Sequence, residues 1–138
     1  MKKLFSIIIP IVCTVFLSAC RSCDVAVQGI TSETWNIVEV KGKVISEYDQ
    51  QPFIMFAEDG RYNGNASVNN FFGEYTIKGE SISFSDAGMT RKMGRSMQTE
   101  TEIMQALFGA RKIKVSGNDV TLSDENGKEL LKLSKASR

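Results

Sequence analysis

Few side chains in this sequence can act as nucleophiles or as ligands for transition metals. The chain contains no histidine and only three cysteines, Cys13, Cys20 and Cys23. Without histidine, neither a Ser-His-Asp nor a Cys-His arrangement nor a His-containing zinc site can form. The adjacent carboxylates Glu58 and Asp59 form a weak candidate for an acid–base pair, because acidic residues are also common in turns. We therefore predict no catalytic residue, no bound metal and no cofactor, and expect a protein that is not an enzyme.

One cysteine has a sequence context with a defined chemistry. Residues 1–3 give a short basic start, and residues 4–17 are almost wholly apolar. This run is shorter than the roughly 20 residues needed to cross a bilayer and is typical of a secretory signal peptide. In Leu17-Ser18-Ala19-Cys20, two small residues precede a cysteine whose thiol can accept diacylglycerol. We expect a lipoprotein signal peptide over 1–19 and a lipidated Cys20; the alternative is an ordinary signal peptide with an incidental cysteine.

A lipid on Cys20 would fix the location of the protein. Burial of acyl chains such as palmitate is worth about 0.8 kcal/mol per methylene, so two or three chains anchor a protein permanently. Arg21 is not the aspartate that favours the inner membrane, so we expect the outer membrane of a bacterial envelope, facing the periplasm. Cys23 would remain as a single thiol in the tether.

The charge balance of the mature chain argues against a nucleic-acid partner. Removal of Lys2 and Lys3 leaves 17 − 2 = 15 basic residues against 16 acidic ones. Nucleic-acid binding needs a basic excess on one face. We expect a monomer that contacts the membrane through its lipid and other envelope proteins through its folded part.

After a linker at residues 20–33, residues 34–138 are expected to form one domain of short strands. Phe71, Gly73, Tyr75 and Ile77 alternate with polar residues and are predicted to share one face of a strand. Asp59-Gly60 is a type I′ hairpin signal. Eight strands are predicted, over residues 35–40, 53–56, 61–63, 71–77, 81–85, 112–116, 120–123 and 129–133.

One segment has a helical period. Thr99 and Glu102 have the spacing of a capping box, in which both side chains bond free backbone amides. Gly109 is placed to end the helix, which we predict over residues 96–108. Its buried face is predicted to consist of Ile103, Met104, Leu107 and Phe108. The fold class is therefore mainly β (α+β): a compact, antiparallel, barrel-like domain of about eight strands with one inserted helix.

The order of these motifs resembles the META domain family (HslJ-like). The resemblance covers residues 34–133. It rests on Trp35, Phe56-Ala57-Glu58-Asp59-Gly60-Arg61, the segment from Gly64 to Tyr75, Met89-Thr90-Arg91-Lys92-Met93-Gly94, the helix from Glu102 to Leu107, and Val120 to Gly127. The family motif places Trp35, Asn69, Gly73, Tyr75 and Thr90 at characteristic positions, for which we expect structural roles.

The sequence departs from this family at two positions. Val68 and Gly94 stand where the family commonly has cysteine. The resemblance implies that the two cysteines face each other as a disulfide in other members of the family. Both cysteines are then expected to be absent together, as they are here. A disulfide closing such a loop would contribute roughly 3–4 kcal/mol in the chain-entropy model.

The charged segment before the helix is the remaining candidate binding site. Arg91, Lys92 and Arg95 place three positive charges beside the helix N-terminus, where an anion such as a lipid headgroup or a polysaccharide phosphate could bind. The plainer interpretation is a solvated loop in which Arg91 bonds backbone carbonyls. Asn69 is similarly expected to hold a turn rather than to touch a ligand.

Three functions stay open from the sequence. The first is an envelope lipoprotein that binds other proteins without catalysis; the resemblance implies a role in envelope stress or maintenance. The second is a barrel that carries a small molecule or lipid in an apolar cavity. The third is an inhibitor or adhesion module at the cell surface.

Overall fold

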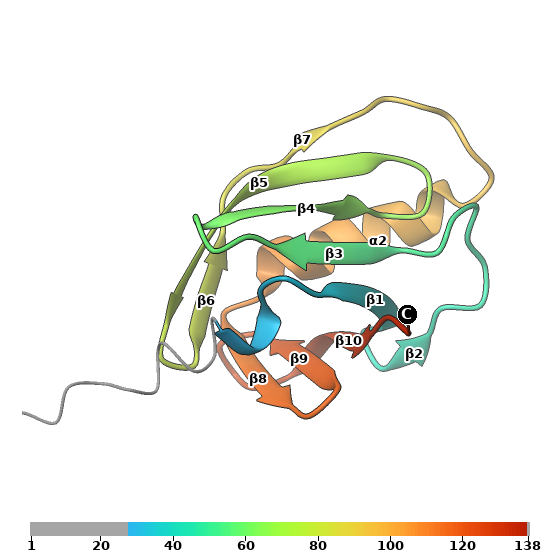
Figure 1. The fold of residues 1–138 in the computed structure, drawn as a ribbon. Coiled ribbons are helices and arrows are strands. Elements are labelled where there is room, and N and C mark those ends of the chain that lie inside the picture. Colours follow the sequence, from blue (N-terminus) through green and yellow to red (C-terminus); the bar gives the residue numbers. More distant parts are fainter. Residues whose placement is uncertain (1–27, 138) are drawn as a thin grey trace, which may run out of the picture.

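The computed structural model describes residues 28–137, which form a closed antiparallel barrel. Eight strands follow one another around it in the order β1, β3, β4, β5, β6, β8, β9 and β10, and β10 pairs back with β1 (Figure 1). This confirms the predicted fold class. The strands are β1 (Thr34–Val40), β2 (Lys43–Val44), β3 (Phe53–Phe56), β4 (Arg61–Asn65), β5 (Asn70–Lys78), β6 (Ser81–Phe84), β7 (Gly88–Met89), β8 (Lys112–Ser116), β9 (Asp119–Ser123) and β10 (Glu129–Lys135), and the helix is α2 (Met97–Gly109). The predicted signal peptide, Cys20 and Cys23 lie outside the described residues.

The strands form where apolar and polar residues alternate. Along β5, Phe71, Gly73, Tyr75 and Ile77 face inward as predicted, and the residues between them are exposed. Two strands of only two residues, β2 and β7, were not predicted. They pair with β1 and β5. Two residues are too few to show an alternation, so their pairing depends on the neighbouring strand alone.

The segment just before β1 also contributes to the core. Residues 28–30 form a helical turn, and the side chain of Ile30 is fully buried. The Ile30 carbonyl accepts a hydrogen bond of 2.9 Å from Nε1 of Trp35, which is itself buried. Part of the predicted linker at 20–33 thus packs against the barrel.

Helix α2 confirms the predicted helix, but the predicted capping box is wrong. The residue before the helix is Ser96, and no side chain caps it locally. The Thr99 hydroxyl instead donates to the carbonyl of Glu47 at 3.0 Å. The Glu102 carboxylate accepts a hydrogen bond from Nε2 of Gln98. The Thr99 hydroxyl, predicted to bond a backbone amide of its own helix, therefore bonds a loop carbonyl 52 residues away in sequence.

The buried face of α2 is narrower than predicted on one side. Ile103, Met104 and Leu107 are buried, whereas Phe108 is 37% exposed. At about 100° per residue, Phe108 lies outside the arc that these three side chains cover. Ala106 closes the other side of the arc and is buried.

The hairpin between β3 and β4 is not the predicted type I′ turn. That turn needs positive φ at both central residues, but among residues 57–61 only Gly60 has positive φ, at +85°. The Ala57 amide donates to the Arg61 carbonyl, and the Gly60 amide donates to the Ala57 carbonyl. The loop is therefore one residue longer, and the glycine supplies its left-handed position.

Two glycines on neighbouring strands make room for aromatic rings. Gly73 pairs with Tyr62, and Gly64 pairs with Phe71. A Cβ atom on Gly73 would lie 2.7 Å from the Tyr62 hydroxyl oxygen, and one on Gly64 would lie 2.7 Å from Cζ of Phe71. Each ring thus covers the glycine opposite it, which explains why the barrel needs glycine at these positions.

The barrel interior is filled by its own side chains. Phe56 and Tyr75 meet edge to face with ring centroids 5.1 Å apart, and Tyr62 meets Phe84 in the same way at 5.2 Å. The Tyr62 hydroxyl donates to the Ser85 carbonyl at 3.0 Å. Burial, and to a smaller extent the nearby Asp86, raises the pKa of Tyr62 to about 12, so the hydroxyl remains a donor at neutral pH. Fully buried aliphatic side chains complete the core: Ile30, Ile37, Ile54, Ile103, Leu107, Val120, Leu122, Leu131 and Leu133.

The two positions at which the family resemblance implies cysteine do face each other. A Cβ atom on Gly94 would lie 2.7 Å from Cγ2 and 2.8 Å from Cγ1 of Val68. The two valine methyl groups therefore occupy the space next to the glycine. Van der Waals contact replaces the covalent bond that a cysteine pair could form here.

Candidate functional site

The predicted charged residues lie in the loop between β7 and α2, which in Figure 1 runs above β5 and then turns down to the start of α2. Arg91 and Lys92 line one cleft of about 420 Å³. Arg95 lines a different cleft, of about 300 Å³, beside β2 and the first turn of α2. The structure thus brings Arg91 and Lys92 together and separates Arg95 from them. We call the larger space, lined by Asn69, Ala87, Met89, Thr90, Arg91, Lys92, Met93, Met97 and Glu100, the loop cleft.

The floor of the loop cleft is held by Asn69, which is 2% exposed. Its Oδ1 accepts hydrogen bonds from the Lys92 amide at 2.6 Å and from the Thr90 hydroxyl at 2.8 Å. Its Nδ2 donates to the Lys92 carbonyl at 3.0 Å and to Oε1 of Glu100 at 3.0 Å. We call these four residues the Asn69 clamp. One side chain thus ties the start of β5 to the loop and to the helix.

Glu100 completes the clamp and was not predicted as a site residue. Its carboxylate lies in the first turn of α2, is buried, and accepts the Asn69 backbone amide through Oε2 at 2.7 Å. A carboxylate is stabilised there by two amide donors and by the positive end of the helix dipole. An acidic residue in the first helical turn was visible in the sequence, but nothing local indicated a partner 31 residues away.

Asp49 occupies the helix N-terminus from outside the loop. Its carboxylate accepts hydrogen bonds of 3.1 Å from the Arg95 amide and from the Ser96 hydroxyl. Its own amide donates to the Ser67 hydroxyl at 2.9 Å. The protein therefore already places a carboxylate where the sequence suggested that an external anion would bind. This leaves Arg91 and Lys92, which line the loop cleft, as the candidate cations for an external anion.

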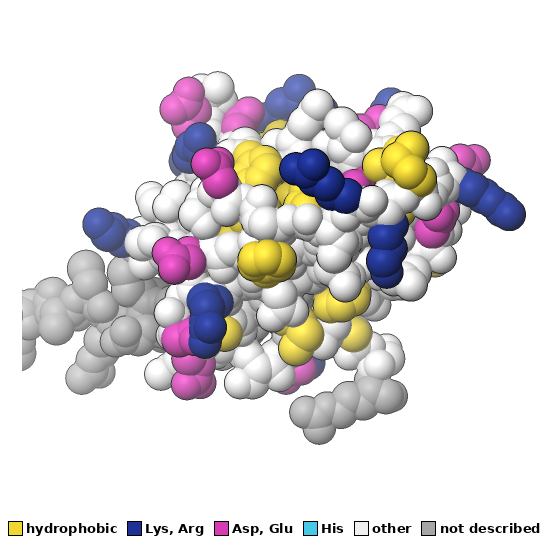
Figure 2. All heavy atoms as spheres, turned by 90° about the horizontal axis from the view of Figure 1, so that it is seen from above, with side chains coloured by type: hydrophobic (Ala, Val, Ile, Leu, Met, Phe, Trp, Pro, Cys, Tyr) yellow, Lys and Arg dark blue, Asp and Glu magenta, His cyan; other side chains and the backbone are white. Residues whose placement is uncertain are grey.

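The side chains of Arg91 and Lys92 are exposed. Within residues 28–137 neither forms an ion pair, because the three pairs found there join Arg61 to Asp59, Lys132 to Glu39 and Lys135 to Glu33. The clamp fixes the backbone of Lys92 and leaves its charged end in solvent. Figure 2 views the molecule from above relative to Figure 1. On the face seen there, apolar side chains lie beside dark blue basic and magenta acidic ones.

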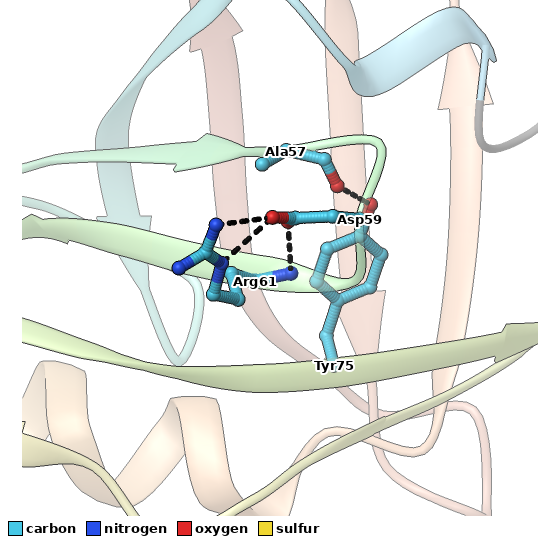
Figure 3. Close-up of polar contacts among 4 residues, drawn as sticks. All are labelled: Ala57, Asp59, Arg61 and Tyr75. Carbon is cyan, nitrogen blue, oxygen red and sulfur yellow. Dashed lines mark hydrogen bonds and ion pairs between the residues drawn. The ribbon is translucent and has the colours of Figure 1, made fainter.

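The other predicted family positions make contacts within the fold. Trp35 bonds the Ile30 carbonyl, Gly73 lies under Tyr62, and the Tyr75 hydroxyl donates to the Ala57 carbonyl at 2.7 Å (Figure 3). Burial is the main cause that raises the pKa of Tyr75. Asn69 and Thr90 are members of the clamp.

The carboxylate pair considered at Glu58 and Asp59 lies at the β3–β4 hairpin. Asp59 accepts hydrogen bonds from the Arg61 amide at 3.1 Å and from Nε of Arg61 at 2.7 Å (Figure 3). These bonds to Arg61 hold the pKa of Asp59 below its usual value and keep the carboxylate ionised. The contact closes the hairpin, which is the turn-forming role expected of an acidic residue at this place.

Comparison with known proteins identifies the fold. A family model described as META domain matches residues 28–137. Three solved structures are similar. A protein studied by NMR has 21% sequence identity and a TM-score of 0.63, with 78% of this chain and 92% of that chain covered. A protein from Burkholderia xenovorans studied by NMR has 19% identity and a TM-score of 0.64, with 83% of this chain and 88% of that chain covered. A DUF4847 family protein from Bacteroides vulgatus, in a crystal structure, has 16% identity and a TM-score of 0.60, with 79% of this chain and 96% of that chain covered. No curated protein matches the chain.

Among the described residues, no helix is long and apolar enough to cross a membrane. Three observations agree on the family: the order of the motifs in the sequence, the barrel with a helix late in the chain, and the family match over residues 28–137. The chain belongs to the META domain family.

Proposed function

We propose that this chain is a lipid-anchored, non-catalytic binding protein of the bacterial cell envelope, and that it contacts an envelope protein through the loop cleft. One observation carries the binding role. The Asn69 clamp holds the backbone of the loop rigidly while the side chains of Arg91 and Lys92 stay exposed. A pre-ordered loop loses little entropy on binding, which favours affinity. The family resemblance adds the association with envelope stress or maintenance.

The charge of the loop cleft indicates the kind of surface that fits it. Arg91 and Lys92 lie on its rim, and Met89, Met93 and Met97 give it an adaptable apolar lining. Basic residues around flexible methionines are suited to an acidic patch on a partner protein. The filled barrel interior supports binding at this surface over the carriage of a ligand inside the barrel.

Site-specific photo-cross-linking in cells tests the loop cleft. A photoreactive amino acid replaces the exposed Asp86, next to Ala87 in the cleft lining. We expect a discrete cross-linked product whose yield falls at least tenfold in the double variant Arg91→Ala/Lys92→Ala. The control Lys112→Ala/Lys114→Ala removes two exposed cations from β8 and should leave the yield unchanged. An equal loss in both double variants, or in neither, contradicts the proposed site.

Anchoring through Cys20 is tested separately. In cells labelled with palmitate, we expect the Cys20→Ser variant to lose all acyl label, because no other residue would carry the chains. The variant should also be absent from the fraction that contains the lipid-anchored membrane proteins. Cys23→Ser is the matched control and should keep both label and location. Label that persists in Cys20→Ser, or a native mass without added acyl chains, would rule the anchor out.

A further inference from the structure

Three methionines occur at every fourth position of one short segment: Met89, Met93 and Met97. They come from different elements, β7, the loop and the first residue of α2, yet all three line the loop cleft. The sequence has six methionines in all, so half of them meet at this one cleft. Met93 is 88% exposed, which hydrophobic burial does not explain.

The backbone near these methionines is held at three points. Residue 89 pairs with Phe71 in the β5–β7 ladder. Lys92, just before Met93, is held through both its amide and its carbonyl by Asn69. The Arg95 amide, two residues before Met97, is held by Asp49. Each thioether sits on a flexible side chain with three rotatable bonds, so each sulfur atom can change its position within the cleft while the backbone stays in place.

Thioethers are soft donors that select monovalent copper over zinc, magnesium or calcium. The chain has no histidine, and its three cysteines all precede residue 28. Methionine sulfurs are therefore the only soft donors in the described part of the chain. The buried carboxylate of Glu100 on the cleft floor adds negative charge nearby. The exposed cations Arg91 and Lys92 oppose a bound cation, but solvent and salt screen them.

We propose that the loop cleft binds one Cu(I) ion through the thioethers of Met89, Met93 and Met97. The ion binds already reduced, so no electron transfer is involved. This inference does not depend on the lipid anchor or on a protein partner, because all three ligands lie within the folded domain. A failure of the cross-linking experiment would not contradict copper binding. A failure to bind copper would not contradict the proposed protein contact.

An anaerobic competition titration tests the site. The full chain in detergent, with its thiols capped by N-ethylmaleimide, is titrated with Cu(I) against a chromophoric Cu(I) chelator. We expect one equivalent to be bound, with at least a tenfold loss of affinity in each of Met89→Leu, Met93→Leu and Met97→Leu. Leucine nearly matches methionine in volume, so the fold should persist. Met55→Leu, at an exposed position on β3 outside the cleft, should bind as the wild type does.

Two further measurements keep the proposal falsifiable if a variant misfolds. X-ray absorption of the wild-type complex should give sulfur scatterers in the first shell of the copper. The methyl resonances of the three cleft methionines should shift on Cu(I) addition while that of Met55 stays in place. A first shell without sulfur, shifts confined to Met55, or equal binding by the triple leucine variant would overturn the site.

Discussion

Replacement of Asn69 by alanine is expected to lower the free energy of unfolding by about 3–5 kcal/mol. The change leaves the Lys92 amide and carbonyl without their side-chain partner and the Thr90 hydroxyl without its acceptor. It also removes one of two donors from the buried Glu100 carboxylate. A buried charge that loses a donor is among the costliest local defects in a folded protein. Urea unfolding followed by tryptophan fluorescence measures the effect, since the single Trp35 is buried in the core.

The neighbouring residue provides a matched control for this variant. Asn70 is exposed, and its side chain accepts one hydrogen bond, from Asn65. We expect Asn70→Ala to cost no more than about 1 kcal/mol. Hydrogen exchange adds a local readout, because the amide of Lys92 should lose protection in Asn69→Ala and keep it in Asn70→Ala. Equal costs for the two variants would show that the clamp does not hold the loop.

A disulfide between positions 68 and 94 is expected to have an effect of similar size in the opposite direction. The two positions are in contact, and the loop that they close spans residues 68–94. In the chain-entropy model, closing a loop of this length raises the free energy of unfolding by about 3–4 kcal/mol. The comparison is between the oxidised and reduced forms of Val68→Cys/Gly94→Cys, in a Cys23→Ser background that prevents mispairing. Urea unfolding of both forms gives the difference directly.

The single variants separate packing from the cross-link. Gly94→Cys alone places its Cβ 2.7 Å from a Val68 methyl carbon and closer still to Oδ2 of Asp49, so it should be destabilised by steric overlap. Val68→Cys alone removes apolar volume and should cost about 1 kcal/mol. If the double variant forms no disulfide under mild oxidation, the two positions are not adjacent in solution. Since Val68 closes this loop by packing, its closure does not depend on an oxidising compartment.

Most elements could be predicted from the sequence, because their signals are local. The alternation at Phe71, Gly73, Tyr75 and Ile77 identifies an inward face, since strand side chains point to opposite sides in turn. The helical period at Ile103, Met104 and Leu107 places α2 within one residue of its observed start and end. These patterns depend only on neighbouring residues. The facing of Val68 and Gly94 was also foreseeable, but through the family resemblance.

The candidate site was predicted only in part. Arg91 and Lys92 were identified as a charged segment, and they do line one cleft. Arg95 lies only three residues beyond Lys92 but lines another cleft, because the chain turns into the helix between them. The convergence of Met89, Met93 and Met97 depends on how β7, the loop and α2 meet. No periodicity of a single element indicates it.

Local chemistry in the sequence therefore determined the strands, the helix and the inward faces of this protein, since short-range sterics and burial select them. Tertiary structure alone decided which polar groups far apart in the sequence form hydrogen bonds with one another. Glu100 bonds Asn69 across 31 residues, and Thr99 bonds Glu47 instead of its own helix. A hydrogen bond needs its two atoms within about 3 Å, and only the closed barrel brings segments so distant in sequence to that separation.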